Sequence, residues 1–138
     1  MGYLLLALVL LLVFIVVLPT VVRALSLLSR RRREAERRAQ SMLVEMLTAE
    51  EYEQMRQNGY LRVQSPAYQN RVYHVPEHSG MVAVFEDGSL KERLCVGAAG
   101  FIPEGDTVML HKLMIEGDED EYLRVANHFP PRPYSFQM

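Results

Sequence analysis

The sequence has a single cysteine, Cys95, and no charged side chain among its first 22 residues. One cysteine excludes an intramolecular disulfide and suits a reducing cytoplasm. The uncharged run from Tyr3 to Val22 also lacks His, Asn and Gln, so it has no side chain to bind a haem, carry protons or line an ion path. It contains no GxxxG motif for close helix pairing. We therefore expect no pore, pump or cofactor-carrying span.

The same run is long enough to cross a bilayer. A helix of about 20 residues, at about 1.5 Å per residue, covers about 30 Å, the thickness of the hydrocarbon core. A cleaved signal peptide would begin with positive charge, have a shorter apolar core and end at a small-x-small site. Here the start MG is uncharged, and only Ala24 and Ser26 form such a pair, between Arg23 and two leucines. Residues 1–28 are predicted to form a permanent transmembrane anchor. A cleaved signal and a buried soluble helix are the alternatives.

Three residues of the anchor have expected roles. Tyr3 lies where aromatic side chains commonly meet the membrane interface. Phe14 belongs to the apolar body of the span, and Pro19 is expected to kink its last turns, because proline lacks an N–H and crowds the preceding turn.

An arginine cluster follows the anchor. Since Lys and Arg near a span stay on the cytoplasmic side, the cluster predicts an N-terminus outside the cell membrane and a cytoplasmic C-terminal domain. The cluster could also bind anionic lipid, because each such residue near an acidic leaflet contributes on the order of 1 kcal/mol. Its members are Arg30, Arg31, Arg32, Arg33, Arg37 and Arg38.

The rest of the chain is acidic and short. All 17 acidic residues lie from Glu34 onward, together with 10 of the 15 basic residues, which leaves a net charge of −7. An acidic domain is a poor match for nucleic acid, so no nucleic-acid partner is expected. About a hundred residues suffice for one small domain.

Two helices are predicted before the strands. Apolar residues spaced three and four apart mark a helix over residues 34–47, which with the arginines forms a basic collar and amphipathic juxtamembrane helix over residues 29–47. Its apolar face would pack on its own domain, lie on the membrane or pair with a partner helix; it comprises Ala35, Ala39, Met42, Leu43, Met46 and Leu47. Thr48 and Glu51 form a capping box that begins a second helix, which ends at Asn58-Gly59.

Strands are predicted from Tyr60. YLRVQ places Leu61 and Val63 on one face, and RVYHVP is a second short strand. MVAVFEDGSLKERLCV is predicted to be a hairpin with a type I′ turn at Asp87-Gly88. A simple register places Phe85 opposite Leu90 and Met81 opposite Leu94, with Lys91 opposite Val84 and Arg93 opposite Val82 on the other face.

Part of the C-terminal region fits two secondary structures. Residues 107–115 could be a helix, with Asp106 as its N-cap, or a strand. Asp118 and Glu121 mark the start of a further helix, whose expected buried face is Tyr122, Val125, Ala126 and Phe129. The domain is thus expected to span residues 48–129, followed by a tail of residues 130–138.

The predicted fold class is α+β: a single transmembrane helix followed by a small domain with a short antiparallel sheet of about four strands, flanked by helices. Tyr134 and Phe136 make the tail more apolar than a free end requires, so they are candidate partner contacts.

The candidate chemical groups are scattered. His74 and His78 are four residues apart in HVPEH, but Pro76 prevents the helical face that a zinc site of the HExxH type needs. His111 and His128 lie in different predicted elements, and Cys95 is expected to be a small buried apolar residue. GDEDEYL lacks the ligand spacing of a calcium loop, and no glycine motif matches a phosphate-binding loop. We expect no metal, no cofactor and no enzyme activity.

These patterns favour a non-catalytic accessory subunit of a larger membrane complex, with its acidic domain on the cytoplasmic face. The expected partners are the lipid bilayer, other membrane protein subunits and anionic lipids. The alternative is a membrane-tethered cytoplasmic module that binds or senses a soluble partner, and a small membrane-bound enzyme is a third reading.

Overall fold

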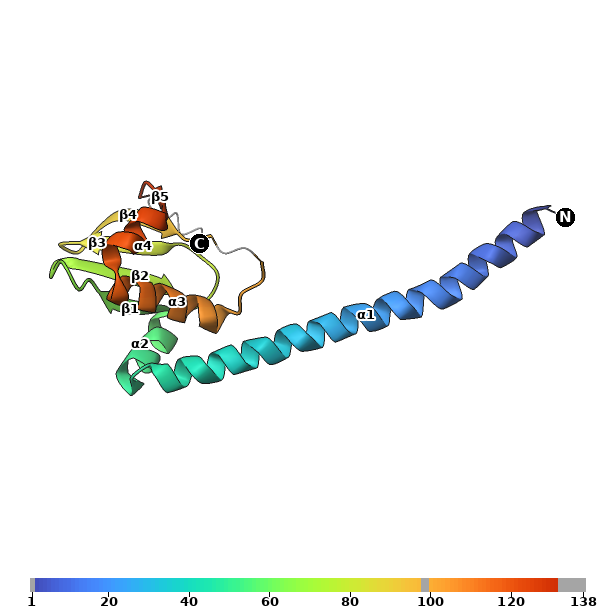
Figure 1. The fold of residues 1–138 in the computed structure, drawn as a ribbon, viewed down its shortest axis with the longest axis horizontal. Helices are drawn as coiled ribbons and strands as arrows, with labels where there is room; N and C mark the ends of the chain where they lie inside the picture. The colour runs from blue at the N-terminus through green and yellow to red at the C-terminus, as the bar shows by residue number, and fades with distance from the viewer. Residues whose placement is uncertain (1, 98–99, 132–138) are drawn as a thin grey trace. The chain divides into compact units, whose positions relative to one another are not determined.

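The fold is α+β, with a long apolar N-terminal helix and a small domain. The computed structural model describes residues 2–97 and 100–131. The chain divides into two compact units, Met1–Arg37 and Arg38–Met138. Helix α1 (Gly2–Met46) is continuous through the boundary, so the anchor, the arginine cluster and the juxtamembrane helix belong to one helix (Figure 1).

In the first unit, α1 is long and apolar enough to cross a membrane, and none of its most apolar stretch is buried. Pro19 lies inside the helix without ending it. The hydroxyl of Thr20 donates to the carbonyl of Val17 at 2.7 Å, and that of Ser26 donates to Arg23 at 2.8 Å. Because these polar hydrogens are bonded within the helix, they need no water.

The second unit contains a five-stranded antiparallel sheet in the order β1-β2-β3-β4-β5, so the expected count of about four strands was too low. Consecutive strands pair with one another throughout, which makes the sheet a simple meander (Figure 1). The strands are β1 (Tyr60–Gln64), β2 (Arg71–Pro76), β3 (Val82–Glu86), β4 (Ser89–Cys95) and β5 (Asn127–Phe129).

Helix α2 (Ala49–Asn58) begins and ends where local signals predicted. The Thr48 N–H donates to Oε2 of Glu51 at 2.9 Å, and the Glu51 N–H donates to Oγ1 of Thr48 at 3.2 Å, which completes the capping box. Gly59 ends the helix with a φ of 75°, a left-handed conformation that glycine adopts without a steric penalty.

The β3–β4 hairpin has the predicted turn and only part of the predicted register. Asp87 and Gly88 have φ values of 50° and 76°, as a type I′ turn requires. Phe85 pairs with Leu90, as expected, but the register shifts between Val84 and Phe85. Consequently the expected pairing beyond the shift was wrong. The observed pairs are Val84 with Glu92, Ala83 with Arg93, and Val82 with Leu94.

Residues 107–115 are helical, within α3 (Glu104–Gly117). The expected N-cap was wrong: Pro103 occupies that position, and Asp106 lies in the first turn, where its charge suits the helix dipole. Proline suits the start of this helix, because it has no N–H group and the first N–H groups of a helix have no intrahelical partner.

Helix α4 (Glu119–Val125) is shorter than predicted. Asp118 caps it, since its side chain accepts from the Glu121 N–H at 2.9 Å. Asn127–Phe129 then forms β5 instead of a last helical turn, because these residues pair with β4 and satisfy its edge. Tyr122 is buried, whereas Phe129 is 38% exposed.

The core lies between one face of the sheet and the helices (Figure 1). Leu43 of α1 and Leu47, which follows the last residue of α1, belong to the core. The C-terminal part of the juxtamembrane helix therefore packs on its own domain, although Met42 and Met46 remain exposed. The sheet contributes Leu61, Val63, Tyr73, Val75, Val82, Val84 and Leu94. The other helices contribute Met55, Val108, Met109, Ile115 and Tyr122, and Ala126 follows the end of α4.

Candidate functional site

The predicted anchor residues all lie on the exposed surface of α1. Tyr3 is 91% exposed and Phe14 is 63% exposed. The side chains of the arginine cluster are exposed on the same helix. Because successive helical residues are about 100° apart, Arg30 to Arg33 surround the helix on all sides. This arrangement suits a positively charged ring at a membrane surface. Tyr134 and Phe136, the candidate partner contacts, lie outside the described residues.

The second unit contains a cavity of about 220 Å³. Three separate segments form its walls: the chain after β2, the end of β4, and the first turns of α3 with the residue Ile102 before them. Sequence reasoning missed this cavity, because no local pattern connects the segments. The lining includes Pro76, Glu77, His78, Ser79, Gly80, Cys95, Val96, Ile102, Glu104, Thr107 and His111.

His111 is the most buried histidine of the domain and contacts Tyr122. Only 5% of His111 is exposed, and its Nδ1 lies 2.9 Å from the hydroxyl of fully buried Tyr122. The two rings meet edge to face, 5.8 Å apart. Burial lowers the pKa of His111 and, with a smaller contribution from Cys95, raises the pKa of Tyr122. Both groups are therefore uncharged at neutral pH.

Two ion pairs lie at the cavity wall. Nδ1 of His78 is 2.7 Å from Oε2 of Glu104, and this hydrogen bond raises the pKa of His78. Glu77 is buried and accepts from Arg56 at 2.7 Å. The charge of Glu77 is thus compensated by Arg56, and that of Glu104 is compensated by His78 when the His78 ring is protonated.

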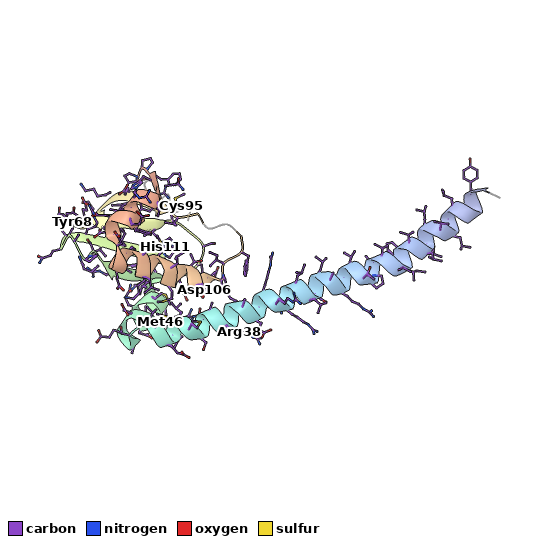
Figure 2. All side chains as sticks on the ribbon, viewed as in Figure 1. Arg38, Met46, Tyr68, Cys95, Asp106 and His111 are labelled. Atoms are coloured by element: carbon purple, nitrogen blue, oxygen red, sulfur yellow. The ribbon has the colours of Figure 1, made fainter. Side chains whose placement is uncertain are left out.

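Cys95 is half-buried at the end of β4, and its thiol is free. Figure 2 labels Cys95 on this strand and His111 on α3. The expectation of a buried apolar residue is only partly met, since Cys95 also lines the cavity. A wall residue of this kind can report on occupancy of the cavity, because its reactivity depends on access.

A second polar cluster has a structural role. Glu119, whose side chain is 3% exposed, accepts from Oγ of Ser65 at 2.6 Å, from the hydroxyl of Tyr73 at 2.5 Å and from Arg71 at 3.1 Å. Arg71 also forms two hydrogen bonds to Glu86. The hydrogen bonds of Glu119 join α4 to the β1–β2 loop and to β2, so this cluster holds the first turn of α4 in place.

The outer face of the sheet has a row of stacked rings. His74 lies 4.0 Å from the ring of Tyr60 and 4.4 Å from the ring of Phe85, measured between centroids. Burial and the nearby Arg62 lower the pKa of His74, so its ring is uncharged at neutral pH. The rings border an open groove that also includes Val72.

Among residues 2–97 and 100–131, no three His, Cys, Asp or Glu side chains are placed to hold a metal ion together. His128 lies on β5 and contacts Glu92.

No protein-family model, curated protein or solved structure matches this chain.

Proposed function

We propose that this protein is a non-catalytic, single-pass accessory subunit of a larger membrane protein complex. The observation that carries the proposal is the unburied apolar stretch of α1. Exposure of apolar surface to water costs about 25 cal/mol per Å², so a helix of this kind requires lipid or another protein around it. The span has no ionisable side chain between Tyr3 and Val22, which favours anchoring and docking over transport.

The arginine cluster and the acidic domain support a cytoplasmic position for the head. The cluster surrounds α1 directly after the apolar stretch, and the chain from Glu34 onward has a net charge of −7. A positive ring suits the anionic inner leaflet, whereas a negative head is repelled from it. In this arrangement the head stands away from the lipid and is accessible to protein partners.

The proposal is tested by extracting the full chain from cell membranes in a mild detergent. We expect the protein to resist alkaline carbonate and to migrate on a native gel with a larger membrane complex at fixed stoichiometry. Release by carbonate would contradict the anchor. Migration as a free monomer in every mild detergent would contradict the accessory role.

A matched pair of variants tests the span itself. Phe14→Arg places a charge at the middle of the span, which costs about 2.5–3.5 kcal/mol during insertion, so we expect loss of the carbonate-resistant fraction. Val22→Arg adds the same charge beside Arg23, where it can extend to the headgroups, and is expected to be retained. Equal retention of both variants would contradict a transmembrane position for Phe14.

A second candidate function is a membrane-tethered module that recruits a soluble partner. The stacked rings of Tyr60, His74 and Phe85 favour it, because an aromatic face of this kind suits protein recognition. A photo-crosslinking residue at position 14 or at position 85 distinguishes the two functions. Capture of a membrane protein at position 14 supports the accessory subunit, whereas capture of a soluble protein at position 85 alone supports the module.

A further inference from the structure

The cavity beside His111 is the feature of the domain best suited to a ligand. Its volume of about 220 Å³ equals that of about seven water molecules, at about 30 Å³ each. Its walls combine the ends of β2 and β4 and the first turns of α3 with loop residues, namely residues 77–80, Val96 and Ile102. A molecule that fits would be smaller than a typical drug.

The hydrogen bond between His111 and Tyr122 determines which nitrogen of His111 is protonated. The Tyr122 hydroxyl is buried, and His111 Nδ1 is its hydrogen-bond partner among the residues that the structure describes. If Nδ1 donated, the hydroxyl hydrogen would have no acceptor, which is unfavourable in a buried site. The hydroxyl therefore donates to Nδ1, and a neutral His111 has its hydrogen on Nε2.

The Nε2–H group is available to a ligand. His111 lines the cavity, and within residues 2–97 and 100–131 no hydrogen bond joins its Nε2 to another side chain or to the backbone. A donor at the surface of a cavity takes its acceptor from water or from a ligand in the cavity. The chemistry of His111 thus selects a carbonyl or similar oxygen.

The charges of the wall select an uncharged molecule. Glu77 is paired with Arg56, and Glu104 is paired with His78. The described lining residues include no Lys or Arg, so an anion would find no free cation there. A cation would have to compete with the existing ion pairs. Val96 and Ile102 supply apolar contact instead.

We propose that this cavity binds a small uncharged molecule that presents a carbonyl oxygen to Nε2–H of His111 and packs its apolar part against Val96 and Ile102. The site is independent of the proposed membrane function, because all its residues belong to the second unit. Occupancy covers the thiol of Cys95.

Benzamide, benzoate and benzamidinium form a suitable set of probes, since they share one shape and differ in charge. The full chain in detergent micelles is titrated with each probe, and the backbone amides of Gly80, Val96 and Thr107 are followed by NMR. We expect saturable shifts with benzamide and binding at least about tenfold weaker for both ions. Benzamidinium has no acceptor for Nε2–H, and benzoate would lie near Glu77 and Glu104 with no Lys or Arg among the described lining residues. Equal or tighter binding of either ion would overturn the proposal, as would the absence of saturable shifts in folded protein.

A pair of variants tests the role of His111. The double variant His111→Phe/Tyr122→Phe removes both ends of the internal hydrogen bond, so no buried polar group remains unpaired. We expect it to fold and to bind benzamide about tenfold more weakly. Tyr122→Phe alone keeps the imidazole, whose Nε2 can still donate, so we expect it to bind benzamide more tightly than the double variant does. Unchanged affinity in the folded double variant would show that His111 makes no contact with the probe.

Alkylation of Cys95 provides a second measurement. The chain has one cysteine, so N-ethylmaleimide modifies a single site. Saturating benzamide is expected to slow the modification several-fold in the wild-type protein and to have a smaller effect in the double variant. An unchanged rate at saturation would contradict binding in this cavity.

Discussion

Gly105 of α3 lies directly against the backbone of Ala39 in α1: a Cβ atom on Gly105 would be 2.8 Å from both the carbonyl carbon and the carbonyl oxygen of Ala39. Backbone atoms cannot move aside as a flexible side chain can. Gly105 therefore permits the close packing of α3 on the C-terminal part of α1.

We predict that Gly105→Ala lowers the free energy of unfolding of the domain by about 1–3 kcal/mol, the usual cost of overpacking. Thermal unfolding followed by circular dichroism measures the change. Gly117→Ala is the matched control in the same helix, because a Cβ at Gly117 would meet no packing neighbour within 4 Å. It is expected to be neutral or to stabilise by up to about 1 kcal/mol. Equal effects would contradict the close contact.

Removal of the buried Glu119 carboxylate should lower the free energy of unfolding more than Gly105→Ala does. Glu119→Ala leaves Arg71 with one of its two carboxylate partners and removes the acceptor of Ser65 and Tyr73. We expect a loss of about 3–5 kcal/mol, because a buried ion pair is broken while its partner remains. Asp120→Ala, at the exposed neighbouring position, should cost less than about 0.5 kcal/mol. Denaturant unfolding of both variants compares them directly.

A fall in pH should lower the free energy of unfolding of the domain through protonation of Glu119. Burial by itself would raise the pKa of Glu119, but hydrogen bonds from Ser65, Tyr73 and Arg71 outweigh burial and hold that pKa below its ordinary value of 4.5. The unfolded state therefore binds the proton more readily. The stability from Glu119 is complete above about pH 4.5 and is lost as the pH falls through the folded-state pKa.

Unfolding measured at a series of pH values tests this sign. The wild-type free energy of unfolding should decline on acidification, and the decline should be shallower in Glu119→Ala. If the free energy of unfolding falls equally with pH in the wild type and in Glu119→Ala, other carboxylates cause the acid sensitivity.

The histidines should titrate in two groups. Nδ1 of His128 is 2.6 Å from Glu92 and its Nε2 is 2.8 Å from the carbonyl of Leu123, so both nitrogens donate when the ring is charged. The hydrogen bond to Glu92 is the larger cause of the raised pKa of His128, whereas burial lowers that of His74. The stability from His128 is present below its ordinary pKa of 6.5 and is lost as the pH rises through the raised value.

NMR titration of the imidazole groups measures this order. His128 should titrate above pH 6.5 and His74 below it. Glu92→Gln should lower the pKa of His128 and leave that of His74 unchanged. A His128 titration unaffected by this variant would contradict the ion pair.

Elements with short-range signals were predictable. The capping box needs only Thr48 and Glu51, and the type I′ turn needs only Asp87 and Gly88, so a few neighbouring residues specify each. The register shift beside Phe85 gave no such signal. Leu90 and Leu94 are four residues apart, which places them on one face of a regular strand, whereas the extra residue between them moves them to opposite faces.

The end of α4 shows a different limit. Tyr122, Val125, Ala126 and Phe129 have helical spacing, yet residues 127–129 form a strand. Their conformation is decided by the free edge of β4, about thirty residues earlier in the chain, since the hydrogen bonds available there outweigh a weak local preference. Long-range pairing of this kind cannot be predicted from the neighbouring residues alone.

By itself, the sequence determined the length and composition of the apolar helix, the position of the arginines after it, the helix caps and the hairpin turn, because each depends on residues close together in the chain. Only the tertiary structure decided the fifth strand, the burial of Glu119 and the cavity that unites His111 with Cys95. Those features depend on which distant segments meet, and that is set by packing of the whole core.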